Sequence, residues 1–67
     1  MRDPKIDPQP GDVVAKETDQ PDISERTVKR RDGNSVFYTR NGGKLRSAVL
    51  ASWQRWCWDA MVIEVAK

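Results

Sequence analysis

Three tryptophans packed into six residues constrain this chain more than any other feature. Trp53, Trp56 and Trp58 are the only tryptophans among 67 residues. Each such ring buries on the order of 150–250 Å², so this segment decides where the core of a small domain lies. At about 100° per residue of a helix, Trp53, Trp56, Cys57 and Ala60 share one stripe, whereas Trp58 projects about 140° away from Trp53. The three rings therefore cannot easily all point inward.

The residue inventory limits the chemistry. Cys57 is the only cysteine and there is no histidine, so the chain can form neither an intramolecular disulfide nor a usual Cys/His zinc site. We expect Cys57 to be a buried small hydrophobe, with an intermolecular disulfide or a reactive thiol as the alternative. Without histidine a nucleophile lacks its usual base. We therefore predict no enzymatic activity, no metal and no cofactor.

Hydropathy indicates a cytoplasmic chain. The N-terminus has no apolar run of the kind found in secretory signals. The apolar stretches 48–51 and 61–63 are far shorter than the ~20 residues of a membrane helix. We predict no membrane partner.

Charge is segregated along the chain. Residues 1–25 carry three basic and seven acidic side chains, residues 26–46 carry seven basic and one acidic, and residues 47–67 balance at zero. A basic block is the expected footprint of a surface that meets phosphate or carboxylate. The competing interpretation is that Arg and Lys supply the solvated faces of strands, with the acidic N-terminal arm as counter-charge.

The N-terminal third divides into an arm, a strand and a loop. Residues 1–10 contain Pro4, Pro8 and Pro10 and predict a flexible, extended, Pro-rich arm. A single domain then spans residues 11–67. It begins with a β-type run over 12–16, followed by a polar loop over 17–25 in which Ile23 could tuck back onto the core.

Residues 26–49 predict a three-stranded antiparallel meander. Asp32-Gly33-Asn34 and Asn41-Gly42-Gly43 separate runs of strand-forming residues, and such turns favour the positive φ that Gly adopts without steric cost. Ser52 is a plausible N-cap for a short helix over 52–60. A final β-type run covers 61–65. The fold class is therefore mainly β, with about five antiparallel strands and one short helix before the last strand.

This order of elements resembles SH3-like small barrels over residues 11–66. The resemblance implies a closed or nearly closed sheet, which would remove exposed strand edges. The chain is also similar to short, uncharacterised proteins of proteobacteria and their phages that begin with Pro-Gly-Asp-Val and carry Trp-x-x-Trp near the end. Here these motifs are residues 10–13 and 53–56. Neither resemblance implies an activity.

The favoured function is nucleic-acid binding, to DNA or RNA, through the basic meander. Phe37 and Tyr38 are adjacent on a strand, so one faces the core and the other faces outward beside the basic side chains. An exposed ring among arginines can stack on bases while the arginines contact phosphate. The candidate nucleic-acid-binding residues are Arg26, Lys29, Arg30, Arg31, Phe37, Tyr38, Arg40, Lys44 and Arg46.

The alternative function is a protein-interaction module that uses Trp58, Arg55 and the neighbouring helix surface. Trp and Arg are enriched at interface hot spots. The competing interpretation is that Trp58 packs against Pro21, Ile23 or the N-terminal prolines. A further alternative is self-association, in which two copies pair through the last strand, Met61 to Val65. We therefore expect a monomer or a weak homodimer.

Overall fold

The computed structural model describes residues 2–17 and 23–66. Within these ranges the chain forms one mainly β unit with a single α-helix. The elements are β1 (Val13–Glu17), β2 (Ile23–Asp32), β3 (Ser35–Arg40), β4 (Leu45–Val49), α1 (Leu50–Trp56), a 3-10 turn over Cys57–Asp59, and β5 (Met61–Glu64). Of the predicted 17–25 loop, residues 18–22 lie outside the described residues. The rest is strand and not loop, since Glu17 ends β1 and residues 23–25 begin β2.

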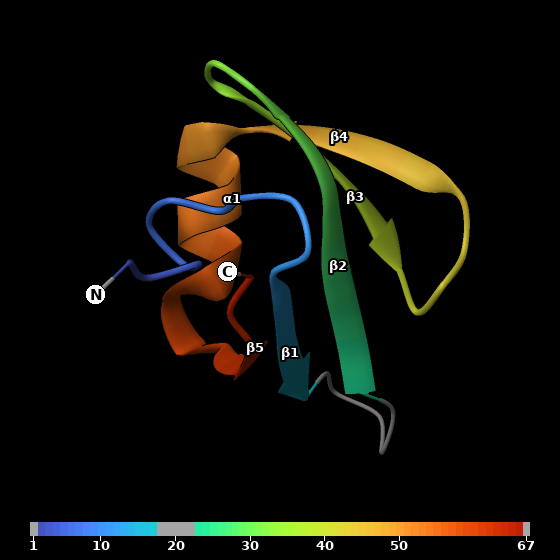
Figure 1. The fold of residues 1–67 in the computed structure, drawn as a ribbon. Coiled ribbons are helices and arrows are strands. Elements are labelled where there is room, and N and C mark those ends of the chain that lie inside the picture. The colour runs from blue at the N-terminus through green and yellow to red at the C-terminus, as the bar shows by residue number, and fades with distance from the viewer. Residues whose placement is uncertain (1, 18–22, 67) are drawn as a thin grey trace.

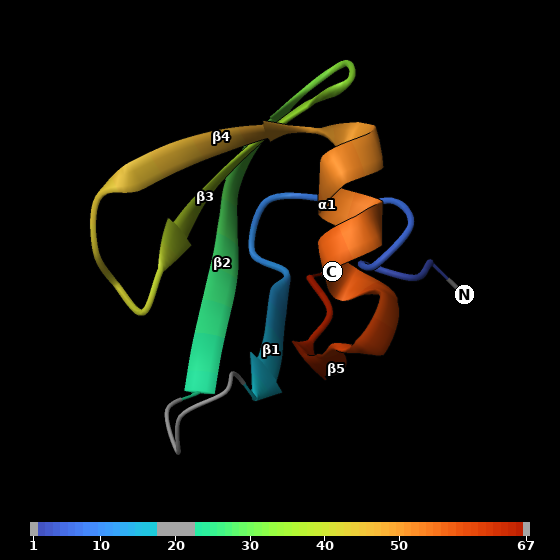
Figure 2. The ribbon, with the colours of Figure 1, turned by 180° about the vertical axis from the view of Figure 1, so that it is seen from behind.

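All five strands belong to one antiparallel sheet in the order β4-β3-β2-β1-β5. The predicted five strands and short helix are confirmed at this level. In the described part of the chain β4 and β5 do not pair with each other, so the sheet is open and no barrel is formed. Figure 1 and Figure 2 show α1 on one side of the curved sheet, with the N-terminal arm lying against the helix.

The core lies between the sheet and α1. Val14, Val28 and Val36 come from three neighbouring strands and are fully buried beneath Trp53. The Trp53 ring lies 5.4 Å from the Tyr38 ring at a tilt of 60°, an arrangement that aromatic pairs favour. The face of the sheet toward α1 is called the helix-bearing face below, and the opposite face is called the outer face.

The helix begins earlier than the sequence predicts. Ser52 is not the N-cap: α1 starts at Leu50, and the flanking Val49 makes no side-chain cap. The reason is that β4 runs directly into α1, and the Leu50 amide donates instead to the Asn34 carbonyl at 2.6 Å. The β2–β3 turn thus supplies an acceptor for one of the helix amides that have no partner within the helix.

Ile23 does not tuck back onto the core. It is the first residue of β2, lies opposite Glu17 of β1, and is exposed. Strand alternation explains this, because Ser24 points to the helix-bearing face and is buried, so Ile23 must point outward.

The N-terminal arm is folded rather than extended. Ile6 and Asp7 donate backbone hydrogen bonds to the Asp3 carbonyl, which closes a turn. Pro4 and Pro8 are fully buried, and the Trp53 indole donates to the Pro4 carbonyl at 3.0 Å. The arm therefore forms one wall of the core.

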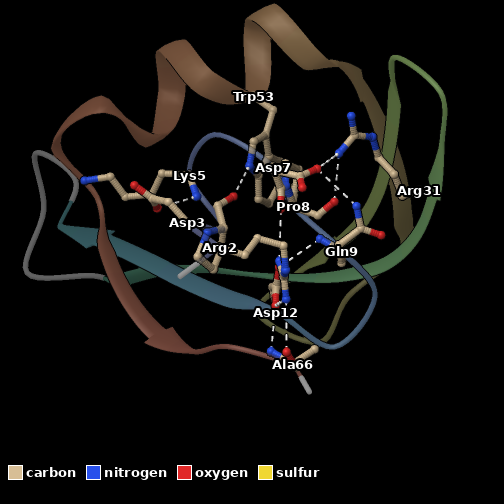
Figure 3. A network of polar contacts seen from close by, with 11 residues as sticks. Arg2, Asp3, Lys5, Asp7, Pro8, Gln9, Asp12, Arg31, Trp53 and Ala66 are labelled. Carbon is tan, nitrogen blue, oxygen red and sulfur yellow. Dashed lines mark hydrogen bonds and ion pairs between the residues drawn. The ribbon is translucent and has the colours of Figure 1, made fainter.

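A set of charged and polar contacts, here called the terminal clasp, fastens this arm to the C-terminal end. Arg2 makes a two-pronged ion pair with Asp12 and also donates to the Ala66 carbonyl at 3.0 Å. Asp12, which is 0% exposed, additionally accepts the amides of Gln9 at 2.8 Å and Ala66 at 2.7 Å. Figure 3 shows Arg2 and Ala66 meeting at the Asp12 carboxylate. The clasp thus links the arm, the entry to β1 and the end of the chain.

Candidate nucleic-acid interface

Three arginines from three adjacent strands lie on the helix-bearing face; Arg26, Arg40 and Arg46 are called the arginine cluster below. Arg26 of β2 is directly opposite Arg40 of β3, and Arg46 of β4 is opposite Tyr38 of β3. Since residues opposite each other point to the same side, and Tyr38 faces the core, Arg46 shares its face. Arg26 shares it too, because it lies two residues before the buried Val28.

Arg26 is the centre of this cluster. Its guanidinium carbon lies 3.8 Å from the Trp56 ring centroid and 4.5 Å from that of Tyr38. Burial lowers the pKa of Arg26, and the charges of Arg40 and Arg46 lower it further. The buried Nε of Arg26 has no hydrogen-bond partner in the structure as described. Like charges placed opposite each other destabilise a sheet, so the cluster is a region where a bound anion would be favourable.

Two other cations near the helix are already neutralised. Lys16 forms a 3.2 Å ion pair with Asp59 and donates to the Trp56 carbonyl. Arg31, whose side chain is 16% exposed, pairs with Asp7 and donates to the Pro8 carbonyl. Arg31 therefore holds the arm in place, in contrast to its predicted position at the binding surface.

The remaining predicted residues do not join the arginine cluster. Phe37 points to the outer face, where the Arg30 guanidinium lies 5.4 Å from its ring, and Tyr38 is the buried member of the aromatic pair. Lys29 is exposed at the β-bulge of β2, and Lys44 is exposed in the turn before β4. The nine predicted nucleic-acid-binding residues thus do not form one surface: the outward aromatic ring and the arginine cluster lie on opposite faces.

A second candidate surface surrounds Trp58. This ring is 85% exposed, as its helical angle indicates. Together with Ile6 and Gln54 it lines a pocket of about 440 Å³ between the arm and the end of the helix. Arg55, the other predicted protein-interaction residue, is exposed but does not line this pocket.

Cys57 is another lining residue of this pocket, and its side chain is buried. Burial raises the pKa of Cys57 to about 11. A thiol with so high a pKa is almost entirely protonated near neutral pH, and the thiolate is the reactive form. Cys57 is packed in the hydrophobic core, as the sequence predicts.

The terminal clasp does not follow from any pattern in the sequence. Arg2 and Asp12 lie ten positions apart in a proline-rich stretch without periodicity, so no pattern predicts their meeting. The one available signal is Pro10-Gly11-Asp12: Gly11 has a φ of +97°, a conformation that glycine adopts readily. It turns the chain so that Asp12 enters the interior.

Comparison with protein-family models, curated proteins and solved structures finds no match to this chain. The resemblance to SH3-like barrels and to short phage proteins therefore stays a prediction. Within residues 2–17 and 23–66, no helix is long and apolar enough to cross a membrane. In the same ranges no group of three or more His, Cys, Asp or Glu side chains is placed to hold a metal ion.

Proposed function

We propose that this chain is a non-enzymatic binding protein that holds a nucleic acid through the arginine cluster. The observation that carries the proposal is the convergence of Arg26, Arg40 and Arg46 on one side of the sheet. Their mutual repulsion costs free energy in the unbound chain. A phosphate backbone offers an array of negative charges that would offset this repulsion.

The half-buried Trp56 ring supports the same proposal. It covers the Arg26 guanidinium at 3.8 Å, which holds that long side chain in one place. A pre-ordered guanidinium loses less conformational entropy when it binds phosphate. Arg40 and Arg46 have no ion-pair partner in the described part of the chain, so binding would not have to break an existing pair.

The test is fluorescence anisotropy of labelled single-stranded and duplex oligonucleotides across a salt series. We choose Arg40→Gln and Arg46→Gln because, unlike Arg26, neither side chain stacks on the core rings. Each change should weaken binding several-fold and reduce the slope of log affinity against log salt by about 0.7–0.9. Arg30→Gln is the control for overall charge, because it removes the same charge from the outer face, where Arg30 is already paired with Asp32 at 3.3 Å.

Two results would contradict the proposal. One is an absence of binding at low salt to any of these oligonucleotides. The other is an equal loss of affinity in all three variants, which would indicate that overall charge matters and the arginine cluster does not.

A second candidate function is protein recognition at the pocket beside Trp58, favoured by the 85% exposure of this ring. Exposed Trp side chains often act as interface anchors. Trp58→Ala should leave the thermal unfolding temperature unchanged and abolish capture of a partner protein. Unfolding of the variant would instead assign Trp58 to the core.

We also propose that the open sheet is a variant of the SH3-like small barrel. The five short antiparallel strands and the helical turn just before β5 support this relationship. A crystal structure in which β5 pairs with a strand other than β1 would refute it.

A further inference from the structure

The two edge strands of the sheet differ in how well they are protected. An edge strand presents unpaired N–H and C=O groups that can recruit another strand, and proteins often block it with charged side chains. β4 carries Arg46 and follows Lys44. β5 reads Met61-Val62-Ile63-Glu64, with three successive apolar side chains and no basic residue or proline. The edge formed by β5 therefore has less charge protection than β4, because its one charged residue, Glu64, lies at the end of the strand.

Exposed apolar side chains also concentrate at β5. The described residues include eight exposed large hydrophobic side chains, and four of them lie between Trp58 and Ile63. Every residue of β5 is exposed. A concentration of exposed apolar surface marks an interaction site, and here it coincides with the unprotected strand edge.

We propose that two copies of this chain pair antiparallel along β5, joining their sheets into one. The charge pattern of β5 suits a second copy as the occupant. The only charge on β5 is Glu64 at its end, and two-fold antiparallel pairing places the two Glu64 side chains at opposite ends of the seam, roughly 10 Å apart. Each Glu64 then lies beside Met61 of the partner copy.

Other pairings of two copies are less favourable. Two-fold antiparallel pairing of β4 with β4 over its five residues would place the Arg46 side chains of the two copies diagonally across the seam, about 7–8 Å apart on the same face. Pairing β5 with β4 is head-to-tail, so it would leave one edge of each kind free and propagate into open filaments. Pairing through β5 is closed, and it leaves the arginine cluster of each copy accessible because that cluster lies on β2, β3 and β4. This proposal does not depend on nucleic-acid binding.

The test compares two lysine substitutions by sedimentation equilibrium over a wide concentration range. Ile63 is 52% exposed on β5 and Leu45 is 61% exposed on β4, so neither variant buries a charge in the core. Ile63→Lys should raise the dimer dissociation constant by about tenfold or more, and Leu45→Lys by less than about twofold. Circular dichroism checks that both variants keep the fold.

A second measurement locates the seam. In a mixture of isotope-labelled and unlabelled wild-type chains, filtered nuclear Overhauser spectra should show contacts between β5 of one copy and β5 of the other. The proposal is overturned if the wild-type chain stays monomeric at about 1 mM. A dissociation constant of that size corresponds to a free energy of dimerisation of about 4 kcal/mol. Equal effects of both lysine variants, or intermolecular contacts from β5 to β4, would overturn it as well.

Discussion

Removal of the Asp12 carboxylate should be the most damaging single polar change in the terminal clasp. Asp12→Ala leaves the Gln9 and Ala66 amides without their acceptor and the Arg2 guanidinium without its partner. A buried donor without a partner costs about 1–3 kcal/mol. Two such donors, partly rehydrated at the surface of the clasp, give an expected loss of about 3 kcal/mol in the free energy of unfolding.

That loss is large for a chain of this size. A domain of 67 residues is stable by roughly 3–10 kcal/mol, and each kcal/mol corresponds to about 4–8 °C in unfolding temperature. Asp12→Ala should therefore lower the midpoint by more than about 10 °C. The assay is urea and thermal unfolding followed by tryptophan fluorescence, since Trp53 contacts the arm through the Pro4 carbonyl.

Two further variants separate the clasp from a general charge effect. Asp12→Asn keeps one acceptor oxygen and should lose less stability than Asp12→Ala. Asp59→Ala removes another ion-paired carboxylate, but one that is exposed, so it should not measurably change the midpoint. The reasoning is refuted if Asp12→Ala stays within about 1 kcal/mol of the wild type.

The pH dependence gives an independent check. Burial alone would raise the pKa of Asp12, but the hydrogen bonds from Arg2, Ala66 and Gln9, together with the Arg2 charge, lower it overall. A lowered pKa in the folded state means that the stabilisation is present above the unfolded value, about 3.9. It is lost as the pH falls through the folded value. Wild-type stability should therefore decline in acid more steeply than that of Asp12→Asn, and parallel curves would contradict this assignment.

Two more predictions concern the core and the turn before β1. Burial raises the pKa of Cys57 from 9.0 to about 11. The contribution of the protonated thiol to stability should therefore be present below about pH 9 and lost as the pH rises toward 11. Urea titrations should show that the free energy of unfolding falls less steeply between about pH 9 and 11 in Cys57→Ala than in the wild type. Gly11→Ala should destabilise the chain by about 1–2 kcal/mol, because a β-carbon there would sit 3.0 Å from the Ala66 side chain at a φ of +97°. Gly33→Ala, also at positive φ but with open space around it, should cost less, and equal midpoints for the two glycine variants would contradict the crowding argument.

Local signals in the sequence were sufficient for much of the fold. The Asp32-Gly33 and Asn41-Gly42 turns each need positive φ and each joins the strands that were predicted. The helical angle of Trp58 relative to Trp53 correctly separates the exposed ring from the buried one. These features depend on residues close together in the chain. For such residues, the helix or strand period sets the direction of each side chain, and the turn residues set the turn conformation.

The distribution of arginines depends on a feature that the sequence does not reveal. Arg26 and Val28 point to the helix-bearing face, so plain alternation would place Arg30 there too. A β-bulge between Val28 and Arg30 shifts the register, so that Arg30 lies opposite Phe37 and Arg31 opposite Val36. One extra residue in a strand exchanges the two faces beyond it. This is why Arg30 reaches the outer face, while Arg31 reaches the arm.

The folded arm could not be predicted for a different reason. Its burial depends on contacts with residues far along the chain, such as the bond from the Trp53 indole to the Pro4 carbonyl. Prolines without periodicity indicate an extended backbone, but they do not indicate what that backbone packs against. Pro4 joins the core only in the folded chain, where its carbonyl accepts the hydrogen bond from the Trp53 indole.

The core and the arginine cluster are joined through one turn of helix. Burial of Trp53 fixes the rotation of α1, and Trp56, three residues later, is thereby placed over Arg26. A ligand at the arginine cluster would consequently change the environment of Trp56 while leaving Trp53 beneath the arm. Binding should thus alter the fluorescence of Trp56 without exposing the core. The Trp56→Phe variant should lose that signal and retain most of the affinity, because a Phe ring can still stack on the Arg26 guanidinium. A signal that persists in Trp56→Phe would place the ligand elsewhere on the molecule.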